Sequence, residues 1–122
     1  MSTAAQASEE LIRAVNNKNA LAKQLTNSRV TCDQKKSLIR HSTLTLQELE
    51  PIPDDAVSYR AVGRMFLKHG LSDIRAEIQT IIDTEQTEVD KLEKVVVTLT
   101  AKLEEADKDL QELLASTGAV AQ

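Results

Sequence analysis

Proline, aromatic and glycine residues are concentrated in one short stretch of this 122-residue chain. Both prolines, both aromatic residues and two of the three glycines fall within positions 51–70. About 50 residues of helix-compatible sequence lie on either side. The sequence therefore predicts two long helices joined by a connector that contains a little β structure.

Aliphatic side chains must form most of the buried surface, because the chain has only one tyrosine and one phenylalanine. Before the connector, side chains spaced by three and four residues form one stripe: Leu11, Val15, Lys18, Ala22, Leu25, Arg29, Cys32, Lys36, Ile39, Thr43 and Leu46. After it, a second stripe comprises Leu71, Ile74, Ile78, Ile81, Glu85, Val89, Leu92, Val96, Leu99, Leu103, Ala106, Leu110 and Leu113. Such stripes predict a mostly α fold, a long antiparallel helical hairpin (a coiled coil) with one short β-hairpin at its connecting end.

The two stripes also predict a register. Laid antiparallel, they bring Cys32 opposite Val89, and Lys36 opposite Glu85, the one acidic residue of the second stripe. Two consecutive steps of four residues at Ile81, Glu85 and Val89 predict a stutter there.

The element boundaries follow from turn and capping residues. Pro51 and Pro53 should end the first helix near Leu49, and its start is open between Thr3 and Ser8. Residues 57–68 should form two short strands joined around Gly63, and Gly70 and Ser72 should precede the second helix. We expect one domain over 1–122, with a helix at 1–50, a connector at 51–70, a helix at 71–117 and a tail at 118–122.

The predicted β-hairpin has apolar residues on both faces, and a two-stranded hairpin is only marginally stable alone. We therefore expect it to pair with other strands in an oligomeric sheet or barrel. The residues assigned to this assembly surface are Tyr59, Ala61, Val62, Gly63, Met65, Phe66 and Leu67.

The far ends of the two helices carry adjacent apolar doublets, Leu11-Ile12 and Leu113-Leu114. Neighbouring residues on a helix point about 100° apart, so one narrow seam cannot bury both members of a doublet. Closure of the last coiled-coil turns is one interpretation, and an exposed binding surface is the other. The candidate contact residues are Leu11, Ile12, Val15, Leu110, Leu113 and Leu114.

The sequence contains no pattern typical of an enzyme, a metal site or a cofactor site. His41, His69 and Cys32 are far apart in the sequence, and we expect ordinary surface, interface or buried roles for them. Residues 71–122 carry five basic against twelve acidic residues, which argues against binding nucleic acid. The N-terminus has neither a signal peptide nor a membrane span, and the single cysteine fits a reducing compartment, so we expect a soluble intracellular protein.

The connector contains Pro53-Asp54-Asp55 followed by Tyr59-Arg60-Ala61-Val62-Gly63-Arg64-Met65-Phe66. These residues resemble the β-type subunits of prefoldin, and the order helix, single hairpin, helix extends the resemblance over nearly the whole chain. The resemblance implies a hexamer of two α-type and four β-type subunits. In such a hexamer the hairpins join into a double β-barrel platform that carries six coiled-coil arms.

The resemblance also implies a function. The arm tips would hold unfolded proteins such as nascent actin and tubulin without ATP, and deliver them to the cytosolic group II chaperonin. The implied partners are other α- and β-type prefoldin subunits, unfolded clients and the chaperonin, with no membrane and no cofactor. The implied location is cytoplasmic, with a nuclear pool left open. The alternative is a purely structural scaffold or tether whose second helix engages a foreign helix.

Overall fold

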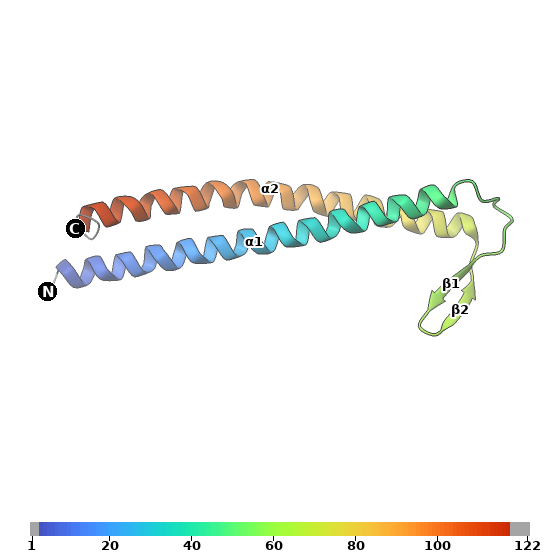
Figure 1. Cartoon of the computed structure of the whole chain (residues 1–122), viewed down its shortest axis with the longest axis horizontal. Coiled ribbons are helices and arrows are strands. Elements are labelled where there is room, and N and C mark those ends of the chain that lie inside the picture. Colours follow the sequence, from blue (N-terminus) through green and yellow to red (C-terminus); the bar gives the residue numbers. More distant parts are fainter. Residues whose placement is uncertain (1–2, 118–122) are drawn as a thin grey trace. The chain divides into compact units, whose positions relative to one another are not determined.

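Along the chain, one long helix is followed by a two-stranded antiparallel sheet and a second long helix, as predicted (Figure 1). The computed structural model describes residues 3–117, with elements α1 (Thr3–Leu49), β1 (Tyr59–Val62), β2 (Met65–Lys68) and α2 (Leu71–Thr117). The chain divides into two compact units. The terminal unit joins the described residues up to Thr31 with those from Leu92 onward, and the connector unit comprises Cys32–Lys91. Within residues 3–117, no helix is long and apolar enough to cross a membrane.

The helix boundaries agree closely with the sequence prediction. Of the two candidate starts for α1, the structure has helix from Thr3. Its end at Leu49 precedes Pro51, and the backbone N–H of Ile52 donates to the carbonyl of Leu49 at 3.1 Å. The predicted tail at 118–122 lies outside the described residues.

In the terminal unit, the first part of α1 packs antiparallel along the last part of α2. Its buried residues are Leu25, Leu99 and Ala106. At the margin of this packing, Lys18 Nζ donates to Asp107 Oδ1 at 2.6 Å. An ion pair between two helices adds little stability when half exposed, but it opposes sliding of one helix along the other.

In the connector unit, the second part of α1 packs along the first part of α2, and the buried residues are Cys32, Leu71 and Val89. Lys35 Nζ donates to Glu85 Oε2 at 3.0 Å. The prediction that Glu85 meets a basic residue is therefore confirmed with Lys35, and the predicted Lys36 beside it is half-buried as well. Burial of both Cys32 and Val89 is consistent with the predicted antiparallel register.

Nine of the eleven stripe residues predicted in α1 are buried or half-buried. Two predicted stripe residues are exposed, Val15 at 37% and Arg29. Half-buried positions outside the predicted stripe include Ala7, Ala14, Leu21, Ser28, Lys35, Ser42 and Leu49. Four of these residues are alanine or serine, which are too small or too polar to add to an apolar stripe in the sequence.

The stutter predicted at Ile81, Glu85 and Val89 is wrong. Ile81 is 41% exposed and its neighbour Ile82 is half-buried. The protected positions Arg75, Ile78, Ile82, Glu85 and Val89 alternate steps of three and four residues without interruption. The half-buried Arg75 lies three residues before Ile78 and belongs to this series, although it is polar and was not part of the predicted apolar stripe.

The β-hairpin has the predicted form. Val62 pairs with Met65 and Tyr59 with Lys68, so Gly63 and Arg64 make a two-residue turn. Gly63 has φ 61°, and no other described residue adjoining it has positive φ. Glycine in the first turn position with positive φ is typical of a type II′ turn, whose twist matches that of the strands.

The helical hydrogen bonds of α2 begin at Gly70. The N–H of Ile74 donates to the carbonyl of Gly70 at 3.0 Å, which makes Gly70 the N-cap. Ser72 was expected to precede the helix, and this is wrong, because α2 begins at Leu71 and Ser72 lies inside its first turn. Asp73 lies in the same turn, where its negative charge is favourable to the helix dipole.

Arg75 ties the connector to the helices. Its Nη2 donates to the backbone carbonyls of Leu49 at 2.7 Å and Ile52 at 2.6 Å, and its Nη1 donates to the carboxylate of Asp54. The Arg75 side chain is only 23% exposed. One cation thus adds a charged donor to the carbonyl of Leu49, which also accepts from the N–H of Ile52, and it pairs with the carbonyl of Ile52 beyond the helix. These bonds fix the path of the chain after α1.

We predict that Arg75→Met lowers the free energy of unfolding by about 1–3 kcal/mol, because the carbonyls at the end of α1 lose a charged donor. Methionine keeps much of the apolar stem, so the loss reports the hydrogen bonds. Denaturant unfolding followed by circular dichroism measures it. Arg40→Met, at an exposed position of α1, is the control and should change stability by less than about 0.5 kcal/mol. Equal effects of the two substitutions would contradict the assigned role of Arg75.

Candidate assembly and client-contact sites

All eight residues of the β-hairpin strands are exposed. Among them, Phe66 is 72% exposed, Met65 64% and Tyr59 61%. A large apolar surface left open in this way is typical of an interaction site. The structure therefore keeps every predicted assembly residue accessible.

The strand register divides these side chains between two faces. Successive strand residues point to opposite sides, so Tyr59, Ala61, Phe66 and Lys68 share one face. The other face carries Arg60, Val62, Met65 and Leu67. Each face is apolar in part, and the outer edges of β1 and β2 have no neighbouring strand within the described residues. The hairpin can thus pair through its edges and pack through its faces.

Polar contacts join the hairpin to the rest of the connector unit. The N–H of His69 donates to the carbonyl of Ser58 at 3.0 Å, and the Ser58 hydroxyl donates to the carbonyl of His69. From α2, Glu77 accepts from Arg60 Nη1 through Oε2, and its Oε1 lies 3.2 Å from His69 Nε2. Sequence reasoning missed Glu77, because a single acidic residue on a helix carries no signal of its partner.

The predicted client-contact residues all fall in the terminal unit. Ile12 is 59% and Val15 37% exposed, whereas Leu11, Leu110, Leu113 and Leu114 are half-buried. The Leu11-Ile12 doublet therefore divides into a covered and an open side chain, as expected. The Leu113-Leu114 doublet does not divide, since both leucines are half-buried.

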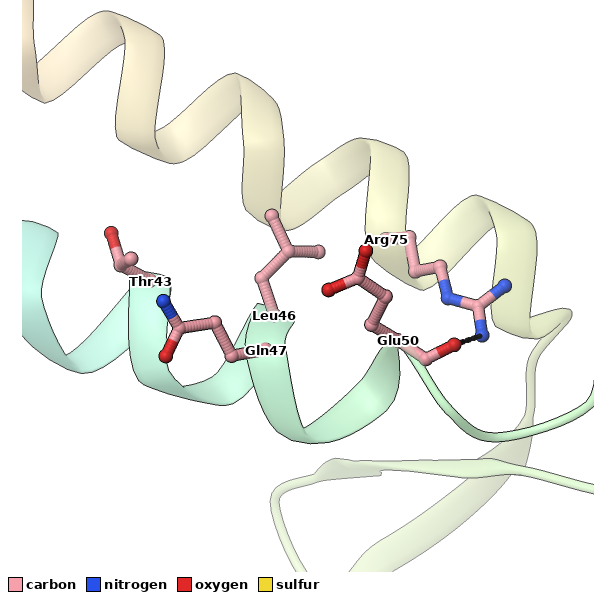
Figure 2. A pocket seen from close by; sticks show the side chains of 5 residues that line it. All are labelled: Thr43, Leu46, Gln47, Glu50 and Arg75. Carbon is pink, nitrogen blue, oxygen red and sulfur yellow. Dashed lines mark hydrogen bonds between the residues drawn. The ribbon is translucent and has the colours of Figure 1, made fainter.

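A groove that the sequence did not predict lies beside the end of α1. It has a volume of about 430 Å³ and is lined by Thr43, Leu46, Gln47, Glu50 and Arg75. Figure 2 shows Leu46 pointing toward α2 and Arg75 reaching from α2 to the backbone of Glu50, where the Nη2 to carbonyl distance is 3.4 Å. The groove is open and holds no pair of acid and base groups in contact.

The structure offers no metal centre among the residues it describes. No group of three or more histidine, cysteine, aspartate or glutamate side chains is close enough to hold an ion in residues 3–117. Cys32 is buried, His41 is exposed, and His69 contacts Glu77.

Comparisons with known proteins find relatives of this chain. A family model described as "Prefoldin subunit" matches residues 13–117. The chain is 30% identical over 82 residues to prefoldin subunit 1 of Tetraodon nigroviridis, covering 67% of each chain. It is 35% identical over 69 residues to prefoldin subunit beta of Thermococcus kodakarensis, covering 57% of this chain and 59% of that one.

A solved structure shows the same arrangement of elements. The crystal structure of the prefoldin beta subunit from Thermococcus strain KS-1 matches with a TM-score of 0.76 and 25% identity, over 86% of this chain and 92% of that one. The helix, hairpin, helix fold and the match over residues 13–117 show that this chain belongs to the prefoldin subunit family, whose members are non-enzymatic chaperone subunits that form complexes with one another.

Proposed function

We propose that this chain is one β-type subunit of a cytoplasmic hetero-hexamer that captures unfolded and nascent proteins, such as actin and tubulin, without ATP. The complex delivers them to the cytosolic group II chaperonin. The chain acts as a single prefoldin domain, and a nuclear pool is the second candidate location. The observation that carries the proposal is a β-hairpin with every strand residue exposed, in a chain that belongs to the prefoldin family.

The hairpin is the proposed assembly surface. Its residues Tyr59, Ala61, Val62, Gly63, Met65, Phe66 and Leu67 present unpaired strand edges and two apolar faces. Pairing with strands of neighbouring α- and β-type subunits would satisfy the edges and cover the faces together. Gly63 supports this surface indirectly, because its positive φ permits the tight turn.

The ends of the helices in the terminal unit are the proposed client-contact sites. Ile12 and Val15 are exposed there, and Leu11, Leu110, Leu113 and Leu114 are half-buried. Each fully covered side chain contributes about 1.5–3 kcal/mol, so one tip alone binds weakly. Several tips acting on one unfolded chain give avidity, which explains holding without a chemical step.

The scaffold or tether alternative requires a second-helix seam free to engage a foreign helix. Val89, Leu99 and Ala106, which lie in that seam, are already buried within their own units. Their burial favours the chaperone proposal.

Co-expression with α- and β-type prefoldin subunits tests the proposal. The purified complex should have the mass of six subunits and should suppress aggregation of denatured actin without ATP. A stable homodimer that gives no protection would contradict the proposal and support the scaffold alternative.

We predict that Phe66→Asp abolishes or strongly weakens assembly, since a charge would be buried where an aromatic ring packs. Native mass spectrometry of the co-expressed subunits measures the loss. Val97→Asp is the matched control, because Val97 is 70% exposed, close to the 72% of Phe66, but lies on α2 outside the hairpin. Normal assembly of the Phe66 variant would show that the hairpin is not the assembly surface.

We predict that Ile12→Ser leaves assembly intact but raises the chaperone concentration needed to suppress aggregation by roughly threefold or more, because apolar contact area is lost. Val30→Ser is the control on the same helix, since Val30 is 50% exposed and lies outside the candidate residues. The two variants are compared by light scattering of denatured actin. If they protected it equally well, Ile12 would not be a client-contact residue.

A further inference from the structure

We infer that Glu77 is a positioning residue that sets which face of the β-hairpin is presented to neighbouring subunits. The inference rests on the proposed assembly through the hairpin and names a determinant of its geometry. Its basis is that one carboxylate on α2 contacts two side chains on the same face of the hairpin.

The strand register shows that the two contacts share a face. Tyr59 pairs with Lys68, and the bond from His69 N–H to the Ser58 carbonyl extends this ladder by one pair. Side chains at Ser58, Arg60, Leu67 and His69 therefore point to the same side. Arg60 and His69 are diagonal neighbours on that side, close enough for the two oxygens of Glu77 to reach both.

The opposite face consequently points away from Glu77. It carries Tyr59 and Phe66, the two aromatic residues of the chain. Apolar burial does not set this choice, because the strand residues of both faces are exposed. The polar contacts of Glu77 distinguish the faces by holding the Arg60 face toward α2 and leaving the aromatic face for a partner.

The energetic effect is expected through preorganisation. Arg60 and Glu77 are 54% and 42% exposed, so their ion pair adds little to the stability of the fold. A hairpin held in one orientation loses less freedom when it binds than one that samples several. Loss of Glu77 should therefore weaken assembly without unfolding the helices.

Glu77→Gln tests the inference in the full chain. It should raise the concentration of α-type subunit needed for half-assembly by about three- to tenfold, with unchanged helix content by circular dichroism. Glu88→Gln is the matched control, since Glu88 also lies on α2 and its ion pair is with Lys91 of the same helix, at 3.9 Å. The charge-swapped double variant Arg60→Glu with Glu77→Arg should assemble better than either single variant. Equal assembly of the Glu77→Gln and Glu88→Gln variants, or no rescue by the swap, would overturn the inference.

A measurement on the free chain separates this inference from the proposed function. Spin labels are placed on cysteines at Arg64, in the hairpin turn, and at Thr84, on α2, after Cys32 is replaced by alanine. The distance distribution between them should broaden in the Glu77→Gln variant and not in the Glu88→Gln variant. A distribution unchanged by Glu77→Gln would overturn the positioning role. A wild-type chain that failed to assemble with prefoldin subunits would instead contradict the proposed function, whatever the label distances.

Discussion

Both strands of a two-stranded sheet are edge strands, so the backbone N–H and C=O groups on their outer sides have no partner within the sheet. The account of this protein depends on that constraint. In this protein the two strands also bury none of their side chains, so the hairpin lacks the packing that normally stabilises a small sheet. Its tight turn at Gly63 and its polar contacts at His69 and Glu77 give it a defined shape. Under the proposed function, contacts with other subunits supply the stability that the hairpin lacks, and the chain belongs to a family whose members form complexes.

Polar side chains also link the elements of the rest of the fold. Lys18 with Asp107 and Lys35 with Glu85 link α1 to α2, one pair in each unit. Arg75 closes the end of α1 through backbone carbonyls. Such contacts contribute modest stability but restrict the register and the chain path. Apolar surface remains exposed at the hairpin and at Ile12. The proposed function assigns this surface to contacts with other proteins.

The sequence predicted the elements well because their boundaries are set by local chemistry. Pro51 and Pro53 end α1, Gly63 makes the turn, and Gly70 precedes α2. Details of the helix seam were less accessible. Ser28 and Ser42 are partly covered although they are polar, and Ile81 is exposed although it is apolar. Such choices depend on how two helices pack, which one helix alone does not reveal.

The candidate sites follow the same division. Exposure of Phe66 and Tyr59 could be predicted, because the β-hairpin has apolar residues on both faces and one helix pair cannot cover both. The contacts of Arg75 and Glu77 could not, since each joins residues that are 8 to 26 positions apart. Long-range hydrogen bonds of single charged side chains leave no periodic pattern in a sequence.

The account depends most on the claim that the hairpin is the surface through which this subunit joins its complex. Hydrogen–deuterium exchange of the chain, alone and after mixing with α- and β-type prefoldin subunits, tests it most directly. Amides of residues 59–68 should exchange rapidly in the free chain and become strongly protected in the complex, with little change in the helices around Cys32 and Val89. Protection confined to the helices, with a hairpin that still exchanges rapidly, would contradict the account.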